Sequence, residues 1–492
     1  MTMLTGILSV CVLCLVWLTL KGWRRARSSE HKLPPAMDGE LPIIGHMHIV
    51  IYYVTNIYKF MKTLSDECAQ KGGVMYGKFG SELYYFITDP QDSLIAASAC
   101  LNRNYAYNLA KVWLGNNSLV LSGGETWKNR RKLLNPAFSL PVIHGFLDVF
   151  NSQAKKLINE FKPYVGKGPF DHSVYFLKTS SETLCVGTFG INPREAAEFT
   201  EKYEKALFDL IRLLIKKFLR FWLQNRLIYK LFGLKKKEDE LVHTLHSMSE
   251  KVLQEKLHDR KNKVLKTQTN GTGYRPFLDL ILDLSENGAL TDREIREETD
   301  TIIFTGIEST SNQLTYILLL LGAHPDVQNK LYEEVLDIVG AERDVVKDDL
   351  NKLVYTNAVI MESLRVLPTV PLILRSVGQD VKLKNYTMRA GSHCLIFPLM
   401  PNVKSTSGTE SDQFRPERWL NADSKTQQEF AGFGLGKRAC LGRTYAIVMM
   451  KVVLAHFIRQ YRVQADMSQL QLSADFAMKP VSGHEISIER RT

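Results

Sequence analysis

The sequence predicts a mainly α protein, with one large helical domain, a small β part and an N-terminal membrane anchor helix. Helical periodicity dominates the chain, strand signals are short and few, and an uncharged apolar run stands near the start. The 492 residues are 45% hydrophobic and 23% charged, as in ordinary globular proteins. Because neither a repeat nor a second linker interrupts the chain after the anchor region, we expect a single large domain.

The first element is an apolar segment from Leu4 to Leu20 that carries no charge and is just long enough to span a bilayer. It lacks a preceding basic region and a following small-residue cleavage site, which favours a retained anchor over residues 1–21 rather than a removed signal peptide. Basic residues follow the segment and should stay in the cytosol: Lys21, Arg24, Arg25 and Arg27. We therefore expect an endoplasmic reticulum membrane protein whose main domain lies in the cytosol.

Residues 22–45 form a basic and proline-rich hinge, because Pro34, Pro35 and Pro42 hold the backbone extended and stiff. The large domain then spans residues 46–492. Apolar residues at helical spacing predict its main helices: Trp127–Leu134, Leu147–Phe161, Glu201–Lys217, Glu240–His258, Asp326–Val339 and Thr444–Tyr461. Strands are predicted at Met75–Thr88 and Val381–Phe397, the second broken by a turn at Ala390-Gly391, and a loop at Asn262–Tyr274.

One predicted helix is much longer than the others. Thr291 and Glu294 form a capping box, and periodic sequence continues from there to Gly322, before His324-Pro325 ends it. At 1.5 Å per residue such a helix is roughly 45 Å long. It must therefore cross the whole domain and pass close to any internal site.

Charge and cysteine usage narrow the class of partner and the compartment. The chain has 63 Lys+Arg against 52 Asp+Glu, a formal charge of +11, which suits an acidic protein, an anionic membrane or nucleic acid. The absence of any zinc-finger, helix-turn-helix or aromatic-interleaved basic segment argues against nucleic acid. The seven cysteines are scattered and odd in number, which indicates a reducing compartment: Cys11, Cys14, Cys68, Cys100, Cys185, Cys394 and Cys440.

The strongest chemical signal is a glycine-rich loop near the carboxyl end, running from Phe433 to Gly442 around Cys440. Its glycines let backbone N–H groups approach the sulfur, and the helix expected from Thr444 adds a positive dipole end that favours thiolate over thiol. The loop therefore predicts that Cys440 is a metal ligand. The alternative is a buried free cysteine, the commonest fate of a lone Cys.

This loop resembles the cysteine loop of the cytochrome P-450 family, whose pattern places Phe, Gly, Arg, Cys and Gly at the spacing of Phe433, Gly436, Arg438, Cys440 and Gly442. The resemblance covers almost the whole chain. It implies a P-450-type helical haem domain, haem b as cofactor, and Cys440 as the thiolate ligand of its iron. The activity it implies is that of a haem-thiolate monooxygenase.

Further segments are similar to the family's structural and haem-binding motifs. Glu362 and Arg365 look like its Glu-x-x-Arg pair, and Arg418 lies where the family's third, buried partner stands. Trp127 and Arg131 share one helix face, as do the family's residues that hold a haem propionate, although a core aromatic is the alternative for Trp127. Two more guanidinium groups are implied as propionate partners: those of Arg438 and, by its position, Arg375.

The middle of the long helix reads Thr305-Gly306-Ile307-Glu308-Ser309-Thr310 and resembles the family's oxygen-binding groove. The resemblance gives Glu308 the role of the acid in proton delivery and puts Ser309 where a threonine is usual. Serine keeps the hydroxyl but loses the methyl that restricts its rotamer, so coupling of electrons to product is expected to be looser. The alternative for Gly306 is a glycine required only by packing.

Two segments are most similar to the microsomal fatty-acid ω-hydroxylase branch in its insect-like form: residues 298–306 and the stretch from Trp113 to Phe138. Thr305 stands where many members of that branch have a glutamate bonded covalently to haem, so we expect non-covalent haem. The usual His-Arg-Asp-Pro run is also absent and is replaced by a polar stretch around Met400-Pro401-Asn402.

The resemblance implies that electrons come from NADPH through an acidic NADPH-cytochrome reductase. We expect this partner to dock on a basic face around Cys440 that includes Lys437, Arg443 and Lys451, with cytochrome b5 as a second donor. Fatty acids, hormones, pheromones and xenobiotics all suit such an enzyme, with specificity expected in residues 105–113, residues 208–222 and Leu372. Two alternatives remain: a haem-thiolate isomerase or dehydratase of lipid peroxides, and a non-enzymatic haem sensor.

Overall fold

The computed structural model describes residues 33–54, 56–261, 275–286, 288–397, 413–474 and 477–491. The predicted anchor over 1–21, residues 22–32 of the hinge, the loop at 262–274 and the Met400–Asn402 segment lie outside the described residues. Within the described ranges, no helix combines the length and the apolar character needed to cross a membrane.

The centre of the fold is α14 (Asp292–Ala323), the long helix that the sequence predicts. Its capping box is present, since the Thr291 side chain accepts a hydrogen bond from the Glu294 N–H and the Glu294 carboxylate accepts one from the Thr291 N–H. Most residues of α14 are buried, and it ends where Pro325 begins α15 (Pro325–Ile338). The helix therefore runs through the interior, as its length requires.

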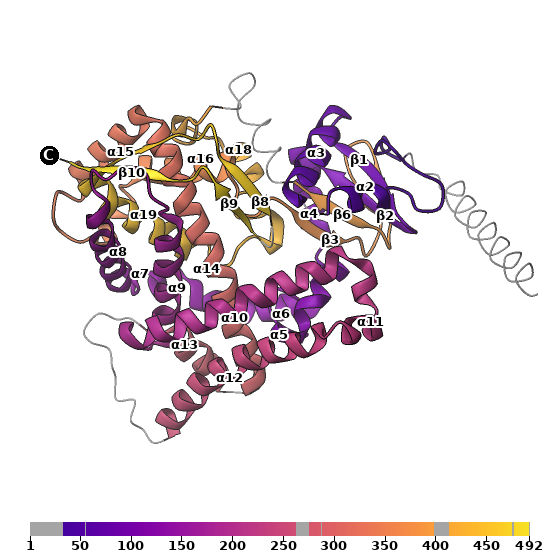
Figure 1. Ribbon diagram of the computed structural model, residues 1–492, viewed down its shortest axis with the longest axis horizontal. Helices are drawn as coiled ribbons and strands as arrows, with labels where there is room; N and C mark the ends of the chain where they lie inside the picture. Colours follow the sequence, from indigo (N-terminus) through magenta and orange to yellow (C-terminus); the bar gives the residue numbers. More distant parts are fainter. Residues whose placement is uncertain are drawn as a thin grey trace, which may run out of the picture.

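Two groups of helices enclose α14 (Figure 1). The first consists of α8 (Leu147–Phe161), α9 (Ser173–Phe189) and α19 (Arg443–Gln460), whose apolar faces meet α14 in the largest core cluster. The second consists of α10 (Pro193–Leu219) and α12 (Leu234–Lys261), which pack on each other and, with the amino-terminal half of α14, form another core. The middle of α14 is consequently held between the two groups.

The remaining helices are shorter and join these groups. Their bounds are α2 (Met47–Tyr52), α3 (Ile57–Gln70), α4 (Pro90–Ala99), α5 (Lys111–Leu114), α6 (Gly124–Leu134), α7 (Leu140–His144), α11 (Arg226–Leu231), α13 (Phe277–Leu284), α16 (Val354–Val366) and α18 (Ser424–Glu429), with short 3-10 turns such as η1 (Tyr105–Ala110) and η8 (Gly436–Arg438).

The β part is small, and its four-stranded sheet lies to one side of the helices (Figure 1). One sheet has the order β1 (Val74–Phe79), β2 (Glu82–Ile87), β6 (His393–Ile396) and β3 (Ile373–Ser376), with only β2 and β6 parallel. Three two-stranded pairs complete it: β4 (Val381–Lys382) with β5 (Thr387–Met388), β7 (Tyr461–Ala465) with β10 (Ile486–Arg490), and β8 (Gln471–Ala474) with β9 (Met478–Ser482).

The predicted helices are confirmed, and several extend beyond their predicted ends because their first and last turns carry too few apolar residues to show the period. The strand predicted over Met75–Thr88 is the β1–β2 hairpin. That predicted over Val381–Phe397 is three short strands rather than two, because the chain turns before β5 as well as at Gly391. Helix α9 escaped prediction, since it is buried on nearly every side and so lacks an amphipathic period.

The Glu362–Arg365–Arg418 cluster predicted from the sequence is present and fully buried. Both oxygens of Glu362 accept from Arg365, at 2.8 Å each, and one also accepts from Arg418 Nε at 2.9 Å. Trp419 Nε1 and the Arg415 N–H donate to the same carboxylate, both at 2.8 Å. These bonds tie α16 to the segment that precedes the cysteine loop and thereby fix where that loop begins.

Candidate active site

The cysteine loop is a tight turn closed by its own backbone. The Cys440 N–H donates to the Phe433 carbonyl at 2.8 Å, and Gly442 caps α19 directly afterwards. Gly436 has φ +64°, and a Cβ there would lie 2.8 Å from Ser98 Oγ and 3.0 Å from the Ala97 carbonyl carbon in α4. Only glycine allows this conformation and this approach, so the loop seats Cys440 against a fixed surface.

Among the described cysteines only Cys440 is exposed; Cys68, Cys100, Cys185 and Cys394 are buried. Dense protein nevertheless surrounds the sulfur, and burial raises the pKa of the Cys440 thiol, opposed by the Gly442 backbone and the charges of Arg131 and Arg443. An accessible cysteine that is closely surrounded by protein could reach a ligand bound next to the loop. Burial thus opposes the thiolate that the loop and the helix start are expected to favour, whereas a coordinated metal ion would itself deprotonate the thiol.

Two buried guanidinium groups near this loop have no acidic partner in the described part of the chain. Arg438 donates to the Ser122 carbonyl and lies 4.4 Å from the centre of the Trp127 ring, while its Nε and Nη1 have no hydrogen-bond partner. Arg375 donates from Nη1 to the Leu374 carbonyl at 2.9 Å, and its Nε has no partner. Burial lowers the pKa of Arg375 to about 10 and that of Arg438 to about 8.

A third arginine, Arg103, completes this group and was not predicted. Burial is the largest cause of the lowered pKa of both Arg375 and Arg438, and the positive charge of Arg103 is the second largest. Arg103 Nε donates to the Val120 carbonyl at 2.6 Å, and its guanidinium lies over the Tyr107 ring. No periodic or motif signal surrounds Arg103, so only the fold could bring it here. Three clustered cations with no carboxylate partner in the described ranges would suit an anion with two acidic groups, such as the propionates of haem.

Trp127 and Arg131 lie on α6 beside the same loop. Trp127 is buried and stacks on Arg438, which joins these two predicted residues directly. Arg131 donates from Nη1 to the Ala439 carbonyl and from Nε to Asn135 Oδ1, both at 2.8 Å. The contacts of Arg131 thus support the cysteine loop from the side.

The middle of α14 has one face that is less buried than the rest of the helix. Ile302, Thr305, Gly306 and Ser309 are only half-buried, whereas nearly all their neighbours in this stretch of the helix are buried. Their spacing of three and four residues places them on one helix face. Ser309 Oγ donates to the Thr305 carbonyl at 2.7 Å, so the hydroxyl is held against the helix backbone on that accessible face.

Glu308 and Gly306 are placed differently from Ser309. Glu308 is buried and directly precedes Ser309, so its Cα lies about 100° round the helix from that of Ser309 on the accessible face. A Cβ on Gly306 would lie 2.8 Å from Leu184 Cδ1 of α9. Close packing of α9 on α14 is therefore one reason for the glycine at position 306. A glycine required by packing is the alternative that the sequence left open.

Comparison with known proteins identifies this arrangement. A sequence profile described as Cytochrome P450 matches residues 34–485. The chain belongs to the cytochrome P450 family. The enzymes of this family are haem-containing monooxygenases, so the protein is an oxidoreductase that uses molecular oxygen. The resemblance seen in the sequence is confirmed, and with it the mainly helical fold with a small β part.

Several similar proteins belong to the family-4 group of cytochrome P450s. Cytochrome P450 4V2 of Mus musculus is 30% identical over 414 residues, which cover 81% of this chain and 78% of the relative. Cytochrome P450 4d10 of Drosophila mettleri is 27% identical over 479 residues, 92% of each chain. Cytochrome P450 4g15 of Drosophila melanogaster is 26% identical, covering 96% and 94%. Insect relatives of this group agree with the branch that the sequence indicated.

Two expectations about this P450 are corrected by the structure. Lys451 is buried and donates to the Leu350 carbonyl at 2.7 Å, so it cannot belong to an exposed docking face; Lys437 and Arg443 are exposed. Within the segment expected to set specificity, Trp113 is buried and packs edge-on against Phe304, 5.2 Å between ring centres, and so belongs to the core. Tyr105 in the same segment is exposed.

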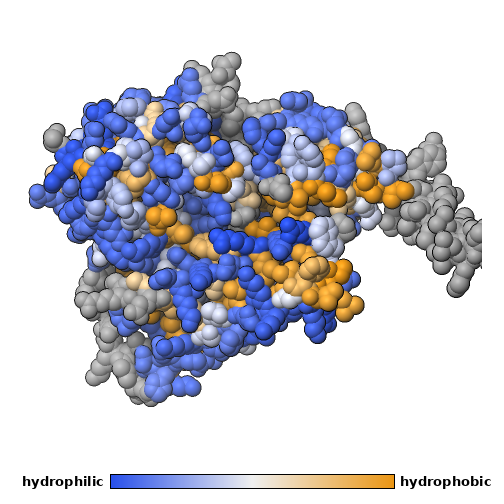
Figure 2. Space-filling view, in the orientation of Figure 1, coloured by the Kyte–Doolittle hydropathy of each residue, from blue (hydrophilic) through white to orange (hydrophobic). Residues whose placement is uncertain are grey.

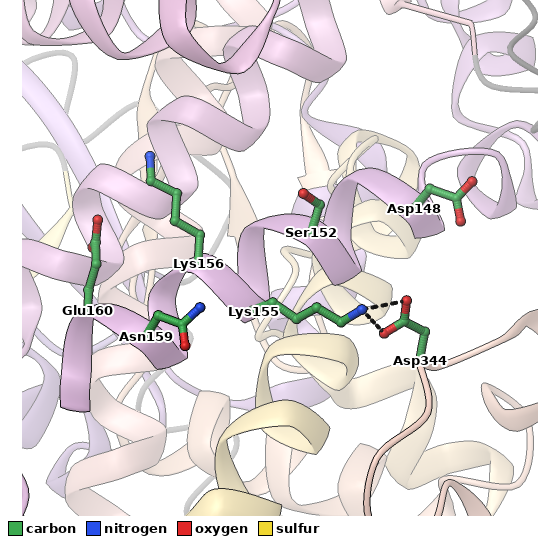
Figure 3. A pocket seen from close by; sticks show the side chains of 7 residues that line it. All are labelled: Asp148, Ser152, Lys155, Lys156, Asn159, Glu160 and Asp344. Carbon is green, nitrogen blue, oxygen red and sulfur yellow. Dashed lines mark hydrogen bonds and ion pairs between the residues drawn. The ribbon is translucent and has the colours of Figure 1, made fainter.

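A surface depression on α8 is not part of this site (Figure 3). Charged residues line it, but its cations already have partners: Lys155 pairs with Asp344 at 2.6 Å, and Lys156 pairs with Glu182. A depression whose positive charges are already neutralised offers little attraction to a charged ligand. None of the predicted site residues lines it.

Proposed function

We propose that this P450 binds haem b non-covalently between the cysteine loop and the accessible face of α14, with the Cys440 thiolate as iron ligand. The exposed sulfur of Cys440, surrounded by protein at the start of α19, is the observation that carries this proposal. When bound, the haem activates dioxygen, so that one oxygen atom enters an apolar substrate. Thr305 supports the non-covalent mode, because its side chain has no carboxylate with which to form an ester.

The propionates of the haem would neutralise the guanidinium cluster. Arg375 and Arg438 have unpartnered N–H groups and lowered pKa values, so both would gain charge-assisted hydrogen bonds from carboxylates. Trp127, which stacks on Arg438, would hold that guanidinium in place, and Arg131 would add positive charge next to the loop. Arg103 would be a further partner at the same group.

Residues of α14 would manage protons on the other side. The Ser309 hydroxyl lies on the accessible face, and release of its bond to the Thr305 carbonyl would let it hold or pass a proton on that face. Glu308 would supply the proton, either by a side-chain rotation or through water, because it does not share the face of Ser309. Serine rotates more freely than threonine, so this relay would lose more reducing equivalents to unproductive release.

Electrons would come from NADPH through a flavin reductase, with cytochrome b5 as a second donor. Lys437 and Arg443 are exposed beside Cys440, and the chain carries a formal charge of +11, which suits an acidic partner. Family members usually work with a redox partner of this kind.

We further propose that residues 46–492 form the haem domain and that it lies on the endoplasmic reticulum membrane, anchored by residues 1–21 through the hinge at 22–45. Exposed apolar side chains support contact with lipid. One group lies at the end of the hinge and in α2 (Leu41, Ile43, Ile44, Ile51 and Tyr52), and another covers the end of α10 and α11 (Phe218, Trp222, Leu227, Leu231 and Phe232). Both lie on the side of the molecule where Figure 2 shows hydrophobic surface.

The substrate would be an apolar small molecule, and family-4 relatives favour a fatty acid or a similar lipid, hormone, pheromone or xenobiotic. Leu372 and the exposed end of the Phe208–Trp222 segment would shape its path. Because Ser309 stands where threonine is usual, a second candidate is an isomerase or dehydratase of lipid peroxides, which needs no external electrons.

Spectroscopy and product analysis of the purified protein test this proposal. The reduced carbonyl complex should show the thiolate spectrum, and Cys440→Ser should lose it while Cys185→Ser keeps it. Reconstitution with reductase and a lipid panel should give hydroxylated products only when NADPH is present. Products formed from lipid peroxides without reductase would favour the isomerase. If the protein neither binds haem nor forms a product, both the enzyme and the haem sensor are rejected.

A further inference from the structure

Two neighbouring amide side chains in α14 form a closed ring of hydrogen bonds with two other segments. Asn312 Nδ2 donates to the Met478 carbonyl of β9 at 2.9 Å. Gln313 Oε1 accepts from Thr369 Oγ1 at 2.8 Å, in the connector between α16 and β3. The Met478 N–H donates to the Thr369 carbonyl at 2.7 Å, and this bond closes the ring. Three segments far apart in sequence are thus joined at one point.

The ring is buried and firmly attached to its surroundings. Thr369, Gln313 and Asn312 are 4%, 1% and 8% exposed. Gln313 also donates from Nε2 to Ser363 Oγ of α16 at 2.9 Å, so its amide is satisfied at both ends. A buried amide costs several kcal/mol unless it is hydrogen-bonded, and full satisfaction makes the geometry specific. Since Leu314 and Ile317 show that this helix accepts apolar residues next to the ring, stability alone does not call for the two amides.

The ring lies beside the proposed oxygen-activating face. Thr369 Oγ1 is also 3.4 Å from the Ser309 carbonyl, one helical turn before Gln313. The next residue, Val370, is 41% exposed although both its flanking residues are buried, and Leu372 is half-buried and packs against the core cluster that contains Met478. Apolar side chains that are accessible next to Ser309 would meet an apolar substrate there.

We propose that the ring formed by Asn312, Gln313, Thr369 and Met478 is a positioning device that sets which carbon of the substrate lies at the reacting centre. It fixes the distance from Ser309 to the connector side chains Val370 and Leu372 and to the β8–β9 hairpin. This inference rests on the proposed function, because the ring positions substrate only if haem binds next to Ser309. Its members are positioning residues and do not touch the reacting atoms.

A series of 1-alkylimidazoles, from methyl to dodecyl, tests this without knowledge of the natural substrate. The ring nitrogen binds iron and shifts the Soret band, so the dissociation constant at each chain length reports the depth and shape of the apolar space. In the wild type we expect an optimum length. Thr369→Val removes the hydroxyl at nearly constant volume, and we expect it to weaken binding at that length by about tenfold (~1.4 kcal/mol) while leaving 1-methylimidazole within a factor of about two.

Matched variants separate positioning from a structural role. Thr369→Ser keeps the hydroxyl donor and should restore the wild-type length profile. Thr183→Val removes a buried hydroxyl that bonds only to the Thr179 carbonyl of its own helix and should change nothing. Asn312→Ala breaks a different bond of the ring and is measured in parallel. If Thr369→Val does not fold, this second variant tests the inference.

An unchanged length profile in both Thr369→Val and Asn312→Ala would overturn the inference, as would equal weakening at every length including methyl, which indicates general loosening of the haem site. A profile that flattens or shifts its optimum in the ring variants alone would support it. Failure of the wild type to bind 1-methylimidazole or to show the thiolate spectrum would reject the proposed function instead, so the two failures are distinguishable.

Discussion

Glu362→Gln should destabilise the protein strongly, because the carboxylate is fully buried and accepts hydrogen bonds on both oxygens. Glutamine keeps only one acceptor oxygen. With its nitrogen in the place of Oε2, the bonds from Arg365 Nε and Trp419 Nε1, both 2.8 Å, are lost. A hydrogen bond to a charged group contributes ~1.5–3 kcal/mol, so the loss is about 3–5 kcal/mol, the range for a broken buried ion pair. This is a large part of the ~5–15 kcal/mol that stabilises a typical protein.

The assay is urea unfolding of the haem-loaded protein, followed by far-ultraviolet circular dichroism and by the Soret band. Glu417→Gln is the matched control, since Glu417 pairs with Lys330 at 2.6 Å on the surface, where the lysine side chain is 53% exposed. Such a pair contributes at most about 1 kcal/mol. If Glu362→Gln unfolds within about 1 kcal/mol of Glu417→Gln, the buried carboxylate does not hold the structure as its hydrogen bonds imply.

Arg438→Leu should weaken haem retention by about tenfold or more, measured by haem transfer to apomyoglobin, because a propionate loses a charged partner; the exposed Lys437→Leu should not. Gly436→Ala should lower the fraction of protein with a thiolate spectrum, since its Cβ would meet Ser98 in α4; a normal fraction would contradict the tight seating of the loop. Burial lowers the pKa of His172 to about 4, below the unfolded value of about 6.5. Its stabilising contribution is present above pH 6.5 and is lost as pH falls toward 4, so His172→Gln should flatten the acid branch of the melting-temperature profile.

The parts of the fold that sequence predicts well are those with a local signal. The capping box at Thr291, the proline after His324 and the periodic apolar residues between them define α14 without any tertiary information. The cysteine loop is equally local, because its glycines and Cys440 lie within ten residues. Helix α9 shows the limit, since a helix buried on nearly all sides has no polar face from which its period could be read.

Charged residues were harder to place than apolar ones. Lys451 and Arg443 are close in sequence to Cys440, yet one is buried in α19 and the other exposed, because eight positions along a helix can turn a side chain from surface to core. Arg103 carries no motif and reaches the guanidinium cluster only because its strand-like neighbour Asn102 pairs with Ser376 beside Arg375. Such pairing joins residues more than 270 positions apart and leaves no trace in local sequence.

By itself the sequence determined the class of this protein: a mainly helical P450 whose cysteine loop marks Cys440, because the residues that define that loop are consecutive. The tertiary structure alone decided what surrounds the loop. It gathered Arg103, Arg375 and Arg438, which have no acidic partner among the described residues, and left one face of α14 more accessible than the rest of that helix. It also closed the ring of Asn312, Gln313, Thr369 and Met478. These arrangements depend on packing between distant segments, whereas local sequence records only the spacing of neighbours.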